Sequence, residues 1–190
     1  MDKIENLNTL FGGSVVVRDG KLSVPNPSSV AGPAMDRLVQ AAVFGDQDER
    51  DHARWMIWEI GQEVGVRAAS IHELYMARGR GECHGFTVPA INVRGMAYDT
   101  ARSIFRTAIK LNAGAFILEI ARSEIAYTDQ RPAEYVAVML GAALREGFRG
   151  PVFIQGDQVV DSRMSVIIDQ CHKETFQPFD VAAARAAKKG

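Results

Sequence analysis

The sequence predicts an α/β fold, and three short apolar runs are the main reason. They cover residues 86–93, 115–120 and 151–156, and each is nearly continuous in apolar side chains, as expected of strands buried on both faces. Amphipathic segments at 97–111 and 132–146 separate the runs. Because strands and helices alternate, we expect the three strands to be adjacent and parallel, in sequence order, with both helices on one face.

Local signals mark the ends of the two helices. The first carries an apolar stripe at three- and four-residue spacing from Ala97 to Leu111, and Asn112 to Gly114 ends it. Pro132 suits the first turn of the second helix, where its missing N–H costs little. Gly147 suits a left-handed residue that terminates the same helix. The sequence therefore predicts these helix boundaries as well as the helices.

The first 80 residues form a region of different character. Asp19-Gly20 favours a tight turn in a hairpin over residues 14–24, and a linker rich in proline and serine follows at 25–33. The remaining pattern predicts helices at about 34–44, 48–64 and 70–78. The last of these begins with Ser70-Ile-His-Glu73, which is typical of a capping box.

Composition bounds the class of protein. Apolar residues make up 47% of the chain, charged residues 24%, and the net charge is −1, which predicts a soluble globular protein and gives no support to nucleic-acid binding. No apolar run reaches the ~18 residues of a membrane span, and the first 20 residues do not resemble a signal peptide. Two cysteines are too few for a disulfide framework, so we expect a cytoplasmic protein.

Each predicted strand ends in a polar residue: Asn92, Glu119 and Asp157. The three segments Thr87-Val-Pro-Ala-Ile-Asn92, Phe116-Ile-Leu-Glu119 and Pro151-Val-Phe-Ile-Gln-Gly-Asp157 resemble the class II (zinc-dependent) fructose-bisphosphate and tagatose-bisphosphate aldolases. The resemblance covers roughly residues 60–158 and is closest to a long-chain branch with an N-terminal helical region. It implies a TIM-type (β/α)8 barrel that binds zinc and a sugar phosphate. It also implies cleavage of a ketose bisphosphate to dihydroxyacetone phosphate and an aldehyde.

The resemblance also implies roles for these residues. Asp157 corresponds to the family carboxylate that acts on the substrate hydroxyl as acid or base; its structural alternative is to cap the following turn. Asn92 corresponds to an asparagine that contacts substrate, and its alternative is a buried amide bonded to backbone. Glu119 is a candidate substrate-binding residue, and its alternative is an ion pair with a nearby arginine.

Gln158 is the main departure from the family. The family has a zinc-binding histidine directly after the aspartate, and a glutamine amide is a poor substitute for it. Cys83-His84 and Cys171-His172 could supply four ligands, but neither pair has the two-residue spacer of a zinc knuckle. We therefore predict no metal site and no zinc in this chain.

A complete barrel takes about 250 residues, whereas this chain has 190. We expect residues 1–80 to form the N-terminal hairpin and helical region, 81–158 a partial barrel of three β/α units, and 159–190 a divergent tail. Such a chain would be a truncated, frame-disrupted or fragmentary aldolase relative without activity. The alternatives are a zinc-dependent sugar-acid epimerase on the same scaffold and a non-catalytic remnant or interaction module. Open sheet edges also predict self-association.

Overall fold

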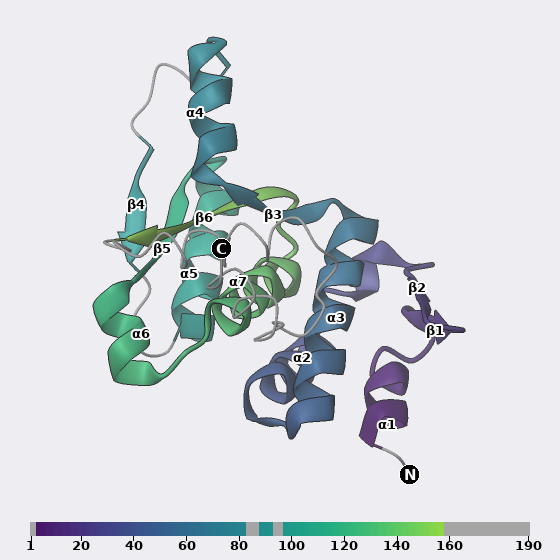
Figure 1. Cartoon of the computed structure of the whole chain (residues 1–190). Helices are drawn as coiled ribbons and strands as arrows, with labels where there is room; N and C mark the ends of the chain where they lie inside the picture. The colour runs from purple at the N-terminus through teal and green to yellow at the C-terminus, as the bar shows by residue number, and fades with distance from the viewer. Residues whose placement is uncertain (1–2, 83–87, 93–96, 158–190) are drawn as a thin grey trace, which may run out of the picture.

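The computed structural model describes residues 3–82, 88–92 and 97–157. Within them the fold is mixed α/β, with a four-stranded parallel sheet flanked by helices (Figure 1). The strands are β3 (Val66–Ser70), β4 (Ala90–Asn92), β5 (Ile117–Ala121) and β6 (Gly150–Asp157). Their order in the sheet is β3-β6-β5-β4. The predicted parallel neighbours β4, β5 and β6 are confirmed.

The fourth strand, β3, was not predicted. Val66-Arg-Ala-Ala-Ser70 has no apolar run, and its alanines and serine have little preference for strands. It forms because it pairs in parallel with β6 over its whole length, from Val66 opposite Gly150 to Ser70 opposite Ile154. The strand that comes first in sequence thus lies at the opposite edge of the sheet from β4, which follows it.

Helices α5 (Ala97–Leu111) and α7 (Pro132–Glu146) have the predicted bounds. Pro132 occupies the first turn of α7, and Gly147 ends it in the left-handed conformation with φ 76°. Both helices share one apolar core with the same face of the sheet, as predicted. Besides Phe105 of α5 and Met139 of α7, that core contains Phe116, which precedes β5, and the following residues of β5 and β6: Leu118, Ile120, Val152 and Ile154.

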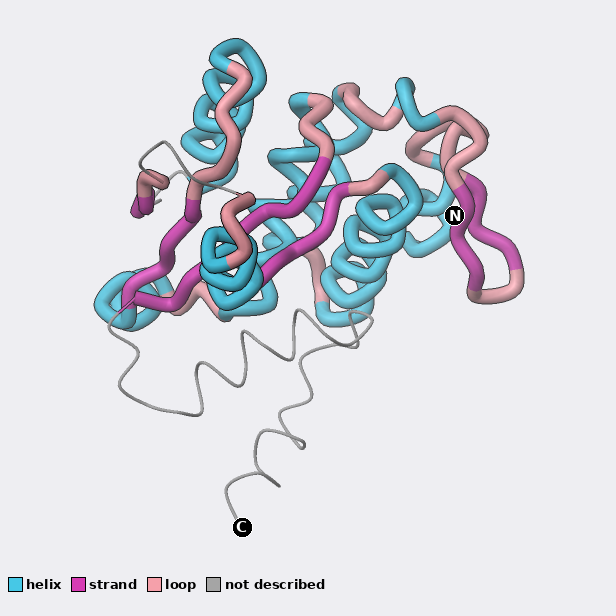
Figure 2. Tube along the Cα trace, turned by 90° about the horizontal axis from the view of Figure 1, so that it is seen from above, coloured by secondary structure: helices cyan, strands magenta, loops and turns pink. Residues whose placement is uncertain are grey.

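The N-terminal region contains α1 (Lys3–Thr9), the hairpin strands β1 (Val16–Arg18) and β2 (Lys21–Ser23), and a short 3-10 helix at Pro27–Ser29. Helices α2 (Pro33–Phe44) and α3 (Gln47–Val64) follow. The predicted hairpin and helices are confirmed, whereas α1 was not predicted. Figure 2 shows this region beside the sheet and its helices. Its apolar residues join the core of α7, which is buried on nearly every side.

Gly141 shows how closely the N-terminal region packs on α7. A Cβ atom at this position would lie 2.4 Å from Cγ2 of Val39 on α2, so only glycine fits without a shift of the neighbours. The contact between α2 and α7 therefore depends on a residue without a side chain.

The helix after β3 starts differently from the prediction. Helix α4 (Ile71–Gly79) has Ser70 at its N-cap, but the serine side chain makes no capping hydrogen bond. The Glu73 carboxylate accepts instead from Arg67, at 2.6 Å. A complete capping box is found at α3, where Asp46 accepts from the Glu49 N–H at 3.1 Å and Glu49 accepts from the Asp46 N–H at 3.0 Å.

Helix α4 projects away from the rest of the molecule (Figure 1). Its Leu74 is buried, whereas Tyr75 and Met76 are exposed. A short helix that the sequence did not predict, α6 (Arg122–Thr128), follows β5 directly. No helix in the described part of the chain is long and apolar enough to span a membrane.

Candidate functional site at the carboxyl ends of the strands

The carboxyl ends of β4, β5 and β6 bring the predicted site residues to one edge of the sheet. Asn92 is the register partner of Glu119, and Glu119 is the register partner of Gln155. These three positions form a row across three neighbouring strands. Asp157 lies two residues beyond Gln155, opposite Ala121. The parallel sheet thus places the backbones of Asn92, Glu119 and Asp157 on three adjacent strands at one edge, where α/β proteins bind ligands.

Strand alternation assigns this row to one face of the sheet. Leu118 and Ile120 belong to the core under α5 and α7, whereas Ile117 belongs to a separate cluster on the other face. Because successive strand residues point to opposite faces, position 119 shares the face of Ile117, away from the two helices. By register, positions 92 and 155 share it too. The backbones of Asn92 and Asp157 are described, but their side chains lie outside the described part.

Glu119 and Gln155 are both partly buried. The backbone at Glu119 is held from the helix layer, because its carbonyl accepts a hydrogen bond from the Tyr135 hydroxyl at 2.7 Å. Burial is the main cause that raises the pKa of Tyr135 above its usual value, so the phenol stays protonated as a donor. A buried side chain of α7 therefore fixes the end of β5.

The chain turns sharply just beyond Glu119. The Ala121 N–H donates to Oε2 of Glu124 at 2.7 Å, and this carboxylate is itself buried. Helix α6 begins immediately after Ala121, the last residue of β5, so the strand ends two residues beyond the row. The local sequence places a carboxylate three residues into α6, where it accepts from the N–H of the N-cap residue as capping glutamates do.

Chemically, the described row offers one carboxylate and one amide, with a second amide and a second carboxylate at positions 92 and 157. Such groups accept and donate hydrogen bonds to hydroxyls. They are a weaker set for zinc, which prefers histidine nitrogen and cysteine sulfur besides carboxylate oxygen. No three His, Cys, Asp or Glu side chains of the described residues are grouped so as to hold a metal ion. Gln158, Cys83, His84, Cys171 and His172 lie outside the described residues.

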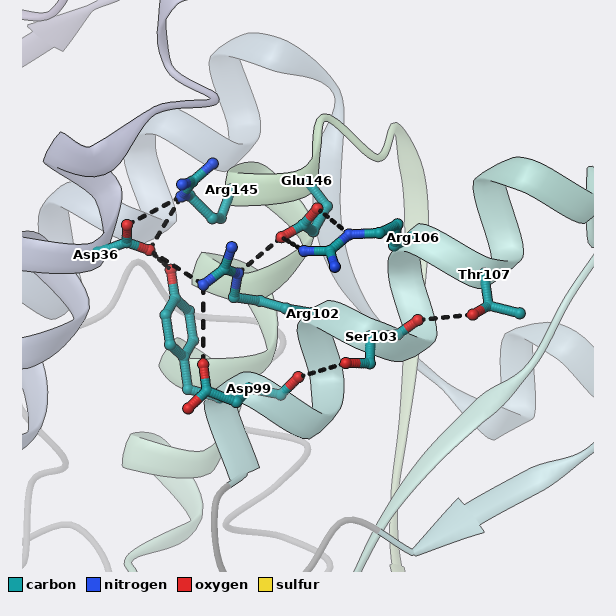
Figure 3. A network of polar contacts seen from close by, with 9 residues as sticks. Asp36, Asp99, Arg102, Ser103, Arg106, Thr107, Arg145 and Glu146 are labelled. Atoms are coloured by element: carbon teal, nitrogen blue, oxygen red, sulfur yellow. Dashed lines mark hydrogen bonds and ion pairs between the residues drawn. The ribbon is translucent and has the colours of Figure 1, made fainter.

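A second polar cluster joins α2, α5 and α7, and no local sequence pattern indicated it (Figure 3). Asp36 of α2 accepts from Nε of Arg145 at 3.0 Å and from the Tyr98 hydroxyl at 2.8 Å. Glu146 accepts from Arg102 at 2.7 Å and from Arg106 at 3.0 Å. Asp36 is more than 60 residues from its partners in sequence, so only the fold brings them together.

This second cluster borders a cavity of about 410 Å³ between α2 and the N-terminus of α5. The carboxylates of the cluster are paired with its arginines. Val39, Val43 and Phe44 of α2 contribute apolar side chains to the cavity wall. We assign the cluster to the docking of the N-terminal region. Its carboxylates accept from arginines of α5 and α7. The polar row lies at the carboxyl ends of the strands, where ligands bind in parallel sheets.

The two described histidines differ in their surroundings. Nε2 of His52 lies 2.7 Å from Oδ1 of Asn8, which links α3 to α1, and burial lowers the pKa of this imidazole. His72 is exposed on α4.

No family model matches the chain. Comparisons with curated proteins and with solved structures likewise found no match.

Proposed function

We propose that the chain is a class II aldolase-like protein that binds a phosphorylated sugar at the carboxyl ends of β4, β5 and β6 without cleaving it. In this proposal these strands are the first three of a β/α barrel. The observation that carries the proposal is the register row Asn92–Glu119–Gln155, with Asp157 two residues further on β6. The segments that resemble the aldolases end at one edge of the sheet, and their polar positions share one face, as a common ligand site requires.

Each position has a stated role in this proposal. Asn92 and Glu119 bind substrate hydroxyls, and Gln155 adds an amide between Glu119 and Asp157 that the motif comparison did not single out. Asp157 is the group that can take or return a proton at a substrate hydroxyl. These functions require only hydrogen bonding and proton transfer by side chains of the chain.

Aldol cleavage requires more than this row provides. In the resembling family, zinc stabilises the negative charge that develops beside the ketose carbonyl. Gln158 replaces the family's ligand histidine, and an amide is not a customary zinc ligand. The donor set therefore does not fit zinc, and we derive no cleavage step for this chain.

Calorimetric titration of the full chain with fructose 1,6-bisphosphate and tagatose 1,6-bisphosphate tests binding. We expect saturable binding that Glu119→Gln weakens about tenfold, the equivalent of one charge-assisted hydrogen bond. Glu63→Gln is the matched control, because Glu63 is exposed on α3. Thermal melts of both variants verify folding. Absence of binding by the folded wild-type chain would refute the proposed site.

A zinc-supplemented aldolase assay tests the second half of the proposal. We expect no turnover from the wild-type chain, and none from Gln158→His, because one histidine does not complete a ligand set. Turnover that disappears in Asp157→Ala would contradict this and would show that other residues of the chain complete a metal site.

A further inference from the structure

The free side of β4 differs from the other edge of the sheet. Within the described part of the chain, β4 pairs with β5 alone and forms one edge (Figure 1). The opposite edge strand, β3, carries Arg67 in an ion pair with Glu73, and charged side chains are a common protection of exposed edges. The described residues of β4, Ala90 and Ile91 among them, carry no charge.

The hydrogen-bond pattern shows which backbone groups of β4 face outward. The Ile117 N–H donates to the Pro89 carbonyl at 2.9 Å, and Ala90 is the register partner of Ile117. In a parallel ladder with this pattern, the residues on either side of Ala90 bond to β5, whereas the N–H and C=O of Ala90 point away from it. Asn92 has the same parity. These two residues present two donors and two acceptors along the edge.

An apolar groove of about 380 Å³ lies beside this edge, between β4 and α5. Its apolar wall includes Ile91, Ile104 and Leu111, and Leu111 is 70% exposed. Three hydroxyl residues of α5 also line the groove: Thr100, Ser103 and Thr107. Two of these hydroxyls bond within the helix, where Ser103 donates to the Asp99 carbonyl at 3.0 Å and Thr107 to the Ser103 carbonyl at 2.9 Å (Figure 3). Among the described residues, none that lines the groove carries a charge.

We propose that this face binds a second copy of the chain, with β4 pairing antiparallel to the partner's β4 across a two-fold axis and the two α5 grooves meeting beside it. An extended strand is what outward-facing backbone groups recognise. Residues near a two-fold axis meet their own copies, so any charge there would meet a like charge. The lining, which is uncharged among the described residues, fits a copy of itself, and interface cores are depleted of charge.

The test is the oligomeric state of the full chain at micromolar concentrations, measured by sedimentation velocity. We expect a dimer. Ala90→Pro removes an outward N–H that does not bond to β5. Each chain of the dimer would lose one hydrogen bond, so two bonds are lost and association should weaken roughly ten- to a hundredfold. Leu111→Glu should weaken it as well, since it places a charge at the groove.

Ile109→Glu is the matched control. Ile109 is an exposed apolar residue of the same helix, 47% exposed, but it does not line the groove. It should leave the dimer intact, and circular dichroism should show that all three variants fold. A monomeric wild-type chain would overturn the proposal. Protection of the Ala90 amide from hydrogen exchange in such a monomer would show that another part of the same chain covers β4. A dimer that Ile109→Glu disrupts and Leu111→Glu does not would also overturn it.

Discussion

The two faces of the parallel sheet differ in how they are covered. On one face, side chains of β5 and β6 pack against α5 and α7, and that core continues through α7 into the N-terminal helices. On the other face, the described residues form a small cluster in which Ile117 and Phe153 meet Leu74 of α4. Glu119 and Gln155 continue this second face toward the carboxyl edge. Among the described residues, the first face therefore contributes most of the core, whereas the second contributes a small cluster.

Among the substitutions that test this difference between the faces, Phe105→Ala should cause the largest loss in the free energy of unfolding. Phe105 is fully buried, with its ring 5.5 Å from that of Phe116 and 5.0 Å from that of Phe148. We expect its truncation to lower the free energy of unfolding by about 4 kcal/mol, and Leu74→Ala on the other face by about 2 kcal/mol. Urea unfolding measures both. A larger loss for Leu74→Ala would show that the sparsely covered face carries the stability.

Gly141→Ala should have the next largest effect on stability. It tests the contact between α7, which covers the first face of the sheet, and α2. The new methyl group would meet Val39 of α2, so we expect a loss of about 2 kcal/mol from overpacking. The matched change is Gly79→Ala at the end of α4, where an added Cβ meets nothing within 4 Å. We expect no loss there and a gain of up to about 1 kcal/mol. Equal losses at both glycines would contradict the close contact of α2 and α7.

Glu146→Gln should have a smaller effect than Phe105→Ala or Gly141→Ala, and this effect should depend on pH. Hydrogen bonds from Arg106 and Arg102 hold the pKa of Glu146 below its ordinary value of 4.5. A carboxyl with a lowered folded-state pKa stabilises the fold above its unfolded pKa, and the contribution is lost as pH falls through the folded pKa. We therefore expect the variant to be about 1 kcal/mol less stable at neutral pH, with the gap closing in acid.

Glu73→Gln is the control on the other side of the sheet. Its ion pair with Arg67 is half exposed, with side-chain exposures of 44% and 48%, so we expect a loss of about 0.5 kcal/mol or less. Thermal melts from neutral pH to acid would compare the two variants. A gap between wild type and Glu146→Gln that persists in acid would rule out the protonation argument.

Much of the site was predictable because its signals are local. Asn92, Glu119 and Asp157 each end an apolar run, and parallel strands necessarily bring their ends to one edge. The row they form with Gln155 was not predictable, since register depends on how three distant segments pair. The resemblance to the aldolase family lies in segments that end at these residues. Only the strand register shows that Gln155 lies opposite Glu119 and two residues before Asp157.

By itself, the sequence determined the helices α5 and α7, the hairpin turn at Asp19-Gly20 and the parallel order of β4, β5 and β6. Periodicity, Pro132 and Gly147 act within a few residues, so they specify local structure without help from the rest of the chain. The tertiary structure alone decided that Val66–Ser70 would be a strand, that Glu73 would pair with Arg67, and that Asp36 would meet Arg145. Each of these depends on a partner that folding brings close, and local propensity is too weak to specify it.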